Sequence, residues 1–159
     1  MLGQLQKKMI GQGAVILLIG MCAGIGLLVS LLGGLELIPG NIIPMGIPGK
    51  TDAWVRAHIG GMMNAFLIMI VALILPVIGA SAQQSRRLYW MLVGTGWANT
   101  VFYWAALFAP NRAISFASNQ YGPSNLASII GLAPALLFAV ISIVAVFMIA
   151  KQALTNSTP

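Results

Sequence analysis

Four uninterrupted charge-free runs constrain the fold of this chain more than any motif does. They cover residues 9–35, 57–85, 88–111 and 113–150. Each is longer than the ~20 residues that a helix needs to cross a bilayer, and a helix satisfies its own backbone where no water can. We therefore predict an all-α fold, an integral membrane four-helix bundle, as a single membrane domain over residues 1–159. The transmembrane helices are predicted at about 9–34, 55–80, 88–109 and 126–150.

The scarcity of charge separates this chain from soluble proteins. Only 6% of its residues are charged, whereas a soluble domain carries about a quarter. The net charge of +6 would suit a nucleic-acid-binding protein, but the basic residues are scattered at the ends of the predicted helices. We therefore expect membrane lipid, and no nucleic acid, as the surroundings of the chain.

The basic residues also indicate the orientation of the helices. Five of them fall on one side of a four-helix arrangement, namely Lys7, Lys8, Arg86, Arg87 and Lys151. The other side carries Lys50, Arg56 and Arg112, with the two acids Glu36 and Asp52. By the positive-inside rule, this bias predicts that both termini lie in the cytoplasm.

The two long connections are both expected on the side opposite the termini. The first, ELIPGNIIPMGIPGKTDAW, contains prolines and glycines that exclude a continuous helix. Its Leu, Ile and Met content suggests that it folds onto the membrane surface. The second, PNRAISFASNQYGPSN, is equally rich in turn residues. A functional site is therefore expected near this end of the bundle.

Polar side chains within the predicted spans are functional candidates, because they are costly in hydrocarbon. They are His58, Asn64, Asn99 and Tyr103. Helical rise places all four in the same half of the bilayer, the half nearer the long connections. Small-residue pairs four apart, such as Gly20 with Gly24, indicate close helix packing within or between subunits.

His58 is the only histidine of the chain. It could be a helix-end residue bonded to a carbonyl group, or a ligand with free space before it. The small neighbours Gly60 and Gly61 favour the second interpretation, in which a neutral imidazole is an axial ligand to a flat macrocycle. Arg56 and Arg112 could pair with carboxylates of such a cofactor, although both could equally extend to the membrane surface.

Other kinds of catalytic or metal site are disfavoured. A zinc site lacks its set of Cys, His or carboxylate ligands, and no Ser-His-Asp arrangement or carboxylate pair can be assembled near the histidine. A haem with one protein ligand is the metal site that remains.

Asn64 lies about 120° around the helix from His58, so Asn64 and Tyr103 could serve the opposite face of a cofactor from a neighbouring subunit. Alternatively, Asn64 makes an interhelical hydrogen bond and Tyr103 belongs to an aromatic belt.

The sequence resembles the styrene oxide isomerases, small four-helix membrane enzymes of bacterial styrene degradation. The shared pattern runs nearly end to end. It comprises GGLELIPG at 33–40, IPG at 47–49, RAHIG at 56–60, LPVIG at 75–79, GWANTVFYWAALFAPNRAISFASNQYGP at 96–123 and LAPALLF at 132–138. The long third-helix segment, of the form GW-x-N-x-x-FY…PNR…F…NQ-x-GP, is the most specific part.

The resemblance implies a homotrimer in the bacterial inner membrane that holds ferric haem b. His58 would be the axial ligand of the iron, and Asn64 and Tyr103 would hold the oxygen of an epoxide. The implied reaction is a Meinwald rearrangement, which converts a lipophilic aryl epoxide such as styrene oxide to an aldehyde, phenylacetaldehyde. Two alternatives remain open at this point: a haem-binding membrane cytochrome, and an accessory membrane subunit without epoxide isomerase activity.

Overall fold

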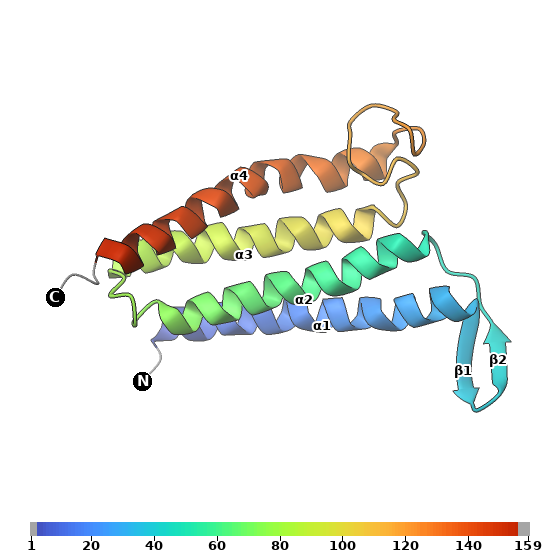
Figure 1. Cartoon of the computed structure of the whole chain (residues 1–159), viewed down its shortest axis with the longest axis horizontal. Coiled ribbons are helices and arrows are strands. Elements are labelled where there is room, and N and C mark those ends of the chain that lie inside the picture. Colours follow the sequence, from blue (N-terminus) through green and yellow to red (C-terminus); the bar gives the residue numbers. More distant parts are fainter. Residues whose placement is uncertain (1–2, 156–159) are drawn as a thin grey trace.

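The computed structural model describes residues 3–155, which form four long helices and one β-hairpin (Figure 1). The helices are α1 (Gln4–Leu32), α2 (Thr51–Ile74), α3 (Ala82–Ala105) and α4 (Leu126–Thr155). The hairpin consists of β1 (Gly34–Ile38) and β2 (Asn41–Pro44). The prediction of an all-α fold is confirmed, with the hairpin as a small addition between α1 and α2.

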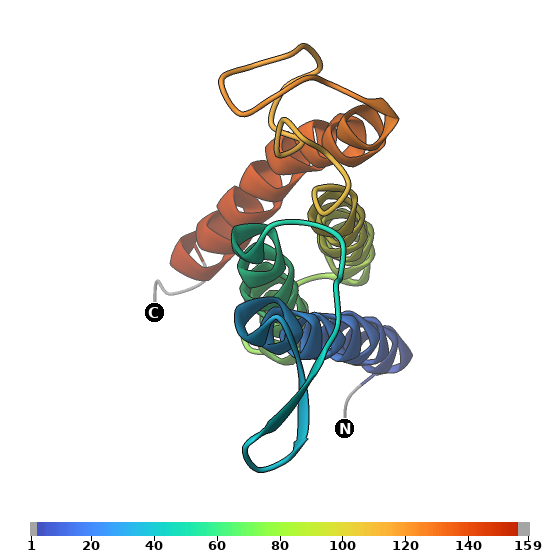
Figure 2. The ribbon, with the colours of Figure 1, turned by 90° about the vertical axis from the view of Figure 1, so that its right-hand side faces the viewer.

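The helices run up and down along one common direction. α1 packs along α2, and α4 packs along α3, with α2 and α3 joining the two pairs (Figures 1 and 2). The start of α1, the end of α4 and the connection from α2 to α3 lie at one end of the molecule. The hairpin and the connection over residues 106–125 lie at the other end, as predicted for the two long connections.

Three of the four helices are long and apolar enough to cross a membrane by length and composition. They are α1, α2 and α4. α3 has the same 24-residue length as α2 but does not meet this measure. Its first turns are polar and include Gln83, Gln84, Arg86 and Arg87. That α3 also spans the membrane stays a prediction, supported by its alignment with its neighbours.

The predicted helix ends differ from the observed ones by up to six residues. α1 and α3 begin five and six residues earlier than predicted, and α4 ends five residues later. Charged residues mark the limit of the hydrocarbon, but they do not interrupt backbone hydrogen bonding. α3 is instead capped by Ser81, the residue before it, whose hydroxyl accepts from Gln84 N–H in a capping box. α2 ends at Ile74, shortly before Pro76, which lacks the N–H that a helix requires.

The connection from α1 to α2 contains ordered strands where the sequence suggested only turns. Gly34 pairs with Pro44 and Leu35 with Ile43, in an antiparallel register closed by a turn at Gly40. Gly40 has φ +80°, a conformation that favours glycine. The hairpin runs across the helix axes (Figure 1), the direction needed to lie along a membrane surface. The strands contain the β-branched residues Ile38, Ile42 and Ile43, which favour this conformation.

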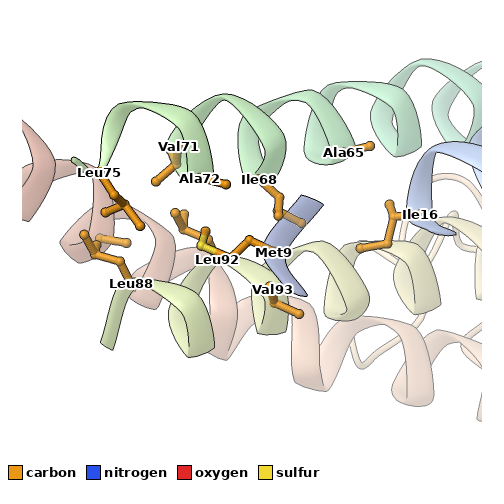
Figure 3. Packing of buried hydrophobic residues seen from close by; sticks show 11 residues of the cluster. Met9, Ile16, Ala65, Ile68, Val71, Ala72, Leu75, Leu88, Leu92 and Val93 are labelled. Carbon is orange, nitrogen blue, oxygen red and sulfur yellow. The ribbon is translucent and has the colours of Figure 1, made fainter. Parts of the chain in front are cut away.

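The main apolar core lies between α1, α2 and α3 toward the end where α1 begins (Figure 3). Its large, fully buried members are Met9, Ile16, Ile68, Leu75 and Leu92. Farther along, α1 and α2 approach each other through glycines. A Cβ atom on Gly20 would lie 3.1 Å from the backbone nitrogen of Met62, so any side chain there would force the helices apart. The small-residue spacing of α1 therefore serves packing within the chain.

Candidate functional site

His58 faces α1, and a hydrogen bond fixes its ring. Its Nδ1 lies 2.9 Å from the carbonyl oxygen of Gly20. Because a carbonyl oxygen only accepts hydrogen bonds, Nδ1 is the donor, and in the neutral ring Nε2 then keeps its lone pair. Gly24, one turn farther along α1, lies beside the ring: a Cβ atom there would be 2.8 Å from the imidazole. The neutral ring is therefore oriented by α1 and fits only because position 24 has no side chain.

The ring opens onto an apolar groove on the outer surface of the α1–α2 pair. The groove has a volume of about 550 Å³ and is lined by Leu17, Met21, Gly24, Ile25, Leu28, His58, Met62 and Phe66. His58 is the only one of these side chains with a nitrogen or oxygen atom. Within residues 3–155 no three His, Cys, Asp or Glu side chains gather to hold a metal ion. A metal at this groove would therefore need a cofactor that brings its own ligands.

The glycines next to His58 in the sequence do not provide its free space, contrary to the prediction. Gly61 lies against the backbone of Gly20, and a Cβ on Gly60 would be 2.5 Å from the ring of Tyr103. The reason is helical geometry, since positions two and three residues beyond His58 point about 200° and 300° around the axis. Gly61 thus allows α1 to pack closely against α2, and Gly60 allows Tyr103 of α3 to do the same. The open space beside the imidazole lies along α1.

A second polar group lies between α2 and α3. Asn99 donates a hydrogen bond through Nδ2 to Oδ1 of Asn64, at 2.9 Å. Asn64 in turn donates through Nδ2 to the carbonyl oxygen of Gly60, at 2.7 Å. The ring of Tyr103 packs against the same turn of α2, over Gly60. The interhelical hydrogen bond considered for Asn64 is therefore present, and it leaves one Nδ2 hydrogen of Asn64 available.

The structure brings Asn64 and Tyr103 together and keeps both away from His58. His58 contacts α1, whereas Asn64 and Tyr103 meet at the α2–α3 contact. The angular separation predicted from the sequence is thus confirmed within one chain. The groove that His58 lines contains neither Asn64 nor Tyr103. Asn99 also appears among the intramembrane polar residues of the sequence, but its role as the partner of Asn64 required the structure.

Arg56 and Arg112 meet at the end of the molecule that carries the long connections. Arg112 forms an ion pair with Asp52, and Nη1 of Arg56 donates to the carbonyl oxygen of Arg112 at 3.5 Å. They border a cavity of about 300 Å³, together with Lys50 and residues of the 106–110 segment. Nε and Nη2 of Arg56 are buried without a hydrogen-bond partner. Since an unpaired buried donor is costly, this guanidinium is suited to a carboxylate or another anion.

The side chain of Asn111 holds the 106–125 connection together through hydrogen bonds, a role that the sequence did not predict. Its side chain is fully buried. Nδ2 donates to the carbonyl oxygens of Ser115 and Ala117, at 2.8 and 3.1 Å. Oδ1 accepts from the Ala113 N–H at 3.0 Å and from the Ser128 hydroxyl at 2.6 Å. The only sequence signal was an asparagine in a turn-rich segment, and its four partners cannot be read from spacing.

This network determines where Arg112 points. Arg112 has φ +64°, a left-handed conformation that is uncommon for a residue with a side chain. The surrounding hydrogen bonds keep it there, with its guanidinium beside Asp52 and 4.7 Å from the centre of the Tyr121 ring. The PNR segment therefore positions an arginine at the start of α2, close to Arg56.

Two comparisons with known proteins match nearly the whole chain to the same family. Residues 5–154 match the family model for styrene oxide isomerase. A styrene-oxide isomerase from Pseudomonas fluorescens is 38% identical over 156 residues, which cover 98% of this chain and 92% of that protein. Together with a helical fold suited to a membrane, these matches show that the chain belongs to the styrene oxide isomerase family of isomerases.

Proposed function

We propose that this protein is a membrane-bound isomerase that converts styrene oxide, or a related aryl epoxide, to the aldehyde by a Meinwald rearrangement. The family match supports the reaction class. The observation that carries the proposal is the His58 groove, where one oriented imidazole faces an otherwise apolar surface. A lipophilic epoxide suits such surroundings, because it enters from the bilayer and meets little water.

The residues of this groove fit a ferric haem b. The Nε2 lone pair of His58 is free to bind iron, and the Gly20 carbonyl supports it as the outer hydrogen-bond partner that such ligands usually have. The apolar lining suits the faces of a porphyrin. Arg56 borders the separate cavity beside Arg112, where its unpaired donors suit a carboxylate such as a propionate. When bound, ferric haem would supply a Lewis acid for the epoxide oxygen.

Asn64 and Tyr103 act on the oxygen atom of the substrate in this proposal. The remaining Nδ2 hydrogen of Asn64 and the hydroxyl of Tyr103 donate hydrogen bonds to that oxygen as the benzylic carbon–oxygen bond breaks. Such donors count for more in a site that excludes water. Asn99 keeps the amide of Asn64 in the donating orientation.

The rearrangement itself is balanced within the substrate. As the benzylic bond breaks, a hydride moves from the neighbouring carbon to the benzylic carbon and the aldehyde carbonyl forms. No proton is gained or lost, so no general base is required. The two acids of the chain agree with this, because Asp52 is paired with Arg112 and Glu36 lies in the hairpin. Exclusion of water protects the developing cation from becoming a diol.

A complete site in this proposal needs two subunits, arranged as a homotrimer in the bacterial inner membrane with both termini in the cytoplasm. His58 of one copy and the Asn64–Tyr103 pair of a neighbouring copy would face the two sides of one cofactor. The position of these side chains on different faces of α2 supports this arrangement. Large apolar side chains such as Leu18, Met21 and Ile25 are exposed on α1 and are available for a subunit contact.

The absorbance spectrum of the detergent-purified protein tests the haem proposal. We expect a Soret band with a high-spin ferric pattern, and we expect His58→Ala to lose most of this band because the only protein ligand is removed. Both the parent protein and the variant are expressed with added haem, so that haem supply does not limit the band. An unchanged band in the variant would reassign the ligand. A low-spin, six-coordinate spectrum of the parent protein would point to a cytochrome instead.

A further inference from the structure

The end of the molecule where α1 begins carries positive charge without acidic partners. Its basic residues are Lys7, Lys8, Arg86, Arg87 and Lys151. Both acids of the sequence lie at the opposite end, in the hairpin and at the start of α2. Within residues 3–155 the one salt bridge joins Asp52 to Arg112. No acidic side chain of the sequence therefore balances the charge at this end.

Two of these cations converge on a cavity between α1 and α3. The cavity has a volume of about 350 Å³ and is lined by Leu5 and Lys8 of α1 with Arg86, Tyr89 and Trp90 of α3. A neighbouring cavity of about 370 Å³ shares Leu5 and extends between the first turns of the same two helices. Both helices begin here, so the positive ends of their dipoles add to the charge of the side chains.

The aromatic side chains give this cavity an apolar side next to its charged side. Trp90 is 64% exposed, and its ring meets that of Tyr89 edge to face at 5.0 Å. Trp90 follows Arg86 by four residues, so the two share one face of α3. Tryptophan and tyrosine are enriched where a membrane meets water. The cavity thus presents two cations toward the surface and an indole toward the hydrocarbon.

We propose that this cavity binds an anionic phospholipid. The headgroup phosphate lies between Lys8 and Arg86, and the acyl chains descend beside Trp90. Basic pockets between membrane helices on the cytoplasmic side bind such headgroups in general. The proposal is independent of the isomerase proposal, since it uses neither the His58 groove nor the α2–α3 polar group. It requires only that this end of α1 and α3 lies at a membrane surface.

Native mass spectrometry of the full chain, titrated with dioleoylphosphatidylglycerol, measures this binding. Lys8→Ala with Arg86→Ala removes both cations of the cavity. Lys7→Ala with Arg87→Ala is the matched control, because these residues are exposed like Lys8 and Arg86 but do not line the cavity. We expect affinity to fall about 30-fold in the cavity variant, from about 1 kcal/mol per basic residue. The control should lose less than about threefold, because its charges lie away from the bound headgroup and salt screens such distant charges.

Trp90→Ala is a second variant that leaves the charge unchanged. We expect it to weaken binding of the lipid as well, because the apolar wall is lost, while circular dichroism shows retained helicity. Equal losses in the cavity variant and its control would overturn the proposal in favour of general attraction. So would equal binding of dioleoylphosphatidylcholine. Complete displacement of the lipid by millimolar inorganic phosphate would assign the site to a soluble anion and would also overturn it.

Discussion

Two glycines of α1 decide what the histidine of α2 can do. The Gly20 carbonyl fixes the tautomer of His58, and the missing side chain of Gly24 leaves room for its ring. Neither residue is polar, and the sequence alone suggested only close packing for them. At the scale of single residues, the proposed ligand and the residues that support it thus come from different helices. The orientation of the imidazole then depends on how closely α1 and α2 approach each other.

Gly24→Ala tests this dependence. A Cβ atom at position 24 would lie 2.8 Å from the His58 ring, so the ring must turn and its hydrogen bond to Gly20 must lengthen. We expect haem affinity to fall about tenfold or more, as is usual when the support of a metal ligand is lost. The measurement is haem titration followed at the Soret band.

Gly11→Ala is the matched control for that substitution. It lies in the same helix, and a Cβ atom there would have nothing within 4 Å. It should leave haem affinity unchanged and retain full helicity. Equal haem affinity in the two variants would show that the ring does not depend on Gly24.

At the scale of elements, the 106–125 connection acts as a rigid support. The side-chain amide of Asn111 makes two donated and two accepted hydrogen bonds within this connection and at the start of α4. The result is a fixed path that brings Arg112 back to Asp52 of α2. A connection of this length is usually mobile. Here a buried asparagine makes it an ordered part of the cavity that contains Arg56.

Asn111→Asp should loosen this connection. The substitution removes the two Nδ2 donations to backbone carbonyls and places a buried charge near Ser128. We expect a loss of about 2–4 kcal/mol in the stability of the loop, seen as faster limited proteolysis between residues 112 and 124. Gln120→Ala, an exposed position of the same connection, is the control and should be cleaved at the parental rate. Unchanged cleavage of the Asn111 variant would contradict the structural role.

At the scale of the whole molecule, the proposed catalytic groups are distributed over two faces. His58 looks out over α1, and Asn64 and Tyr103 lie at the α2–α3 contact. We therefore expect a site that uses all three to be assembled from two copies of the chain. Subunit mixing can distinguish this arrangement from a site within one subunit.

Co-expression of His58→Ala and Tyr103→Phe chains provides that distinction. Each variant alone should lose most turnover, and Tyr103→Phe should keep its haem while losing about 100-fold in kcat. In a mixed cyclic trimer with sites between subunits, about a quarter of the sites regain both intact residues. Styrene oxide turnover of the mixture should then approach about a quarter of the parental rate. No recovery would place both residues in one subunit.

Much of this architecture follows from the sequence because hydrocarbon imposes simple rules. The spans, the common end of the long connections and the angle between His58 and Asn64 depend on helix geometry alone. The contacts of Gly60 and Gly61 do not, because they depend on which neighbouring helix packs at each position. The network of Asn111 likewise depends on a loop path that no periodicity encodes.

The up-and-down order of the helices determines where the two ends of the chain lie relative to the membrane. α1 starts and α4 finishes at the same end of the molecule (Figure 1). α3 lies alongside its neighbours, and the prediction that it also crosses the membrane gives an even number of crossings between the two ends. A fluorescent or enzymatic reporter joined ahead of α1 therefore occupies the same compartment as one joined after α4.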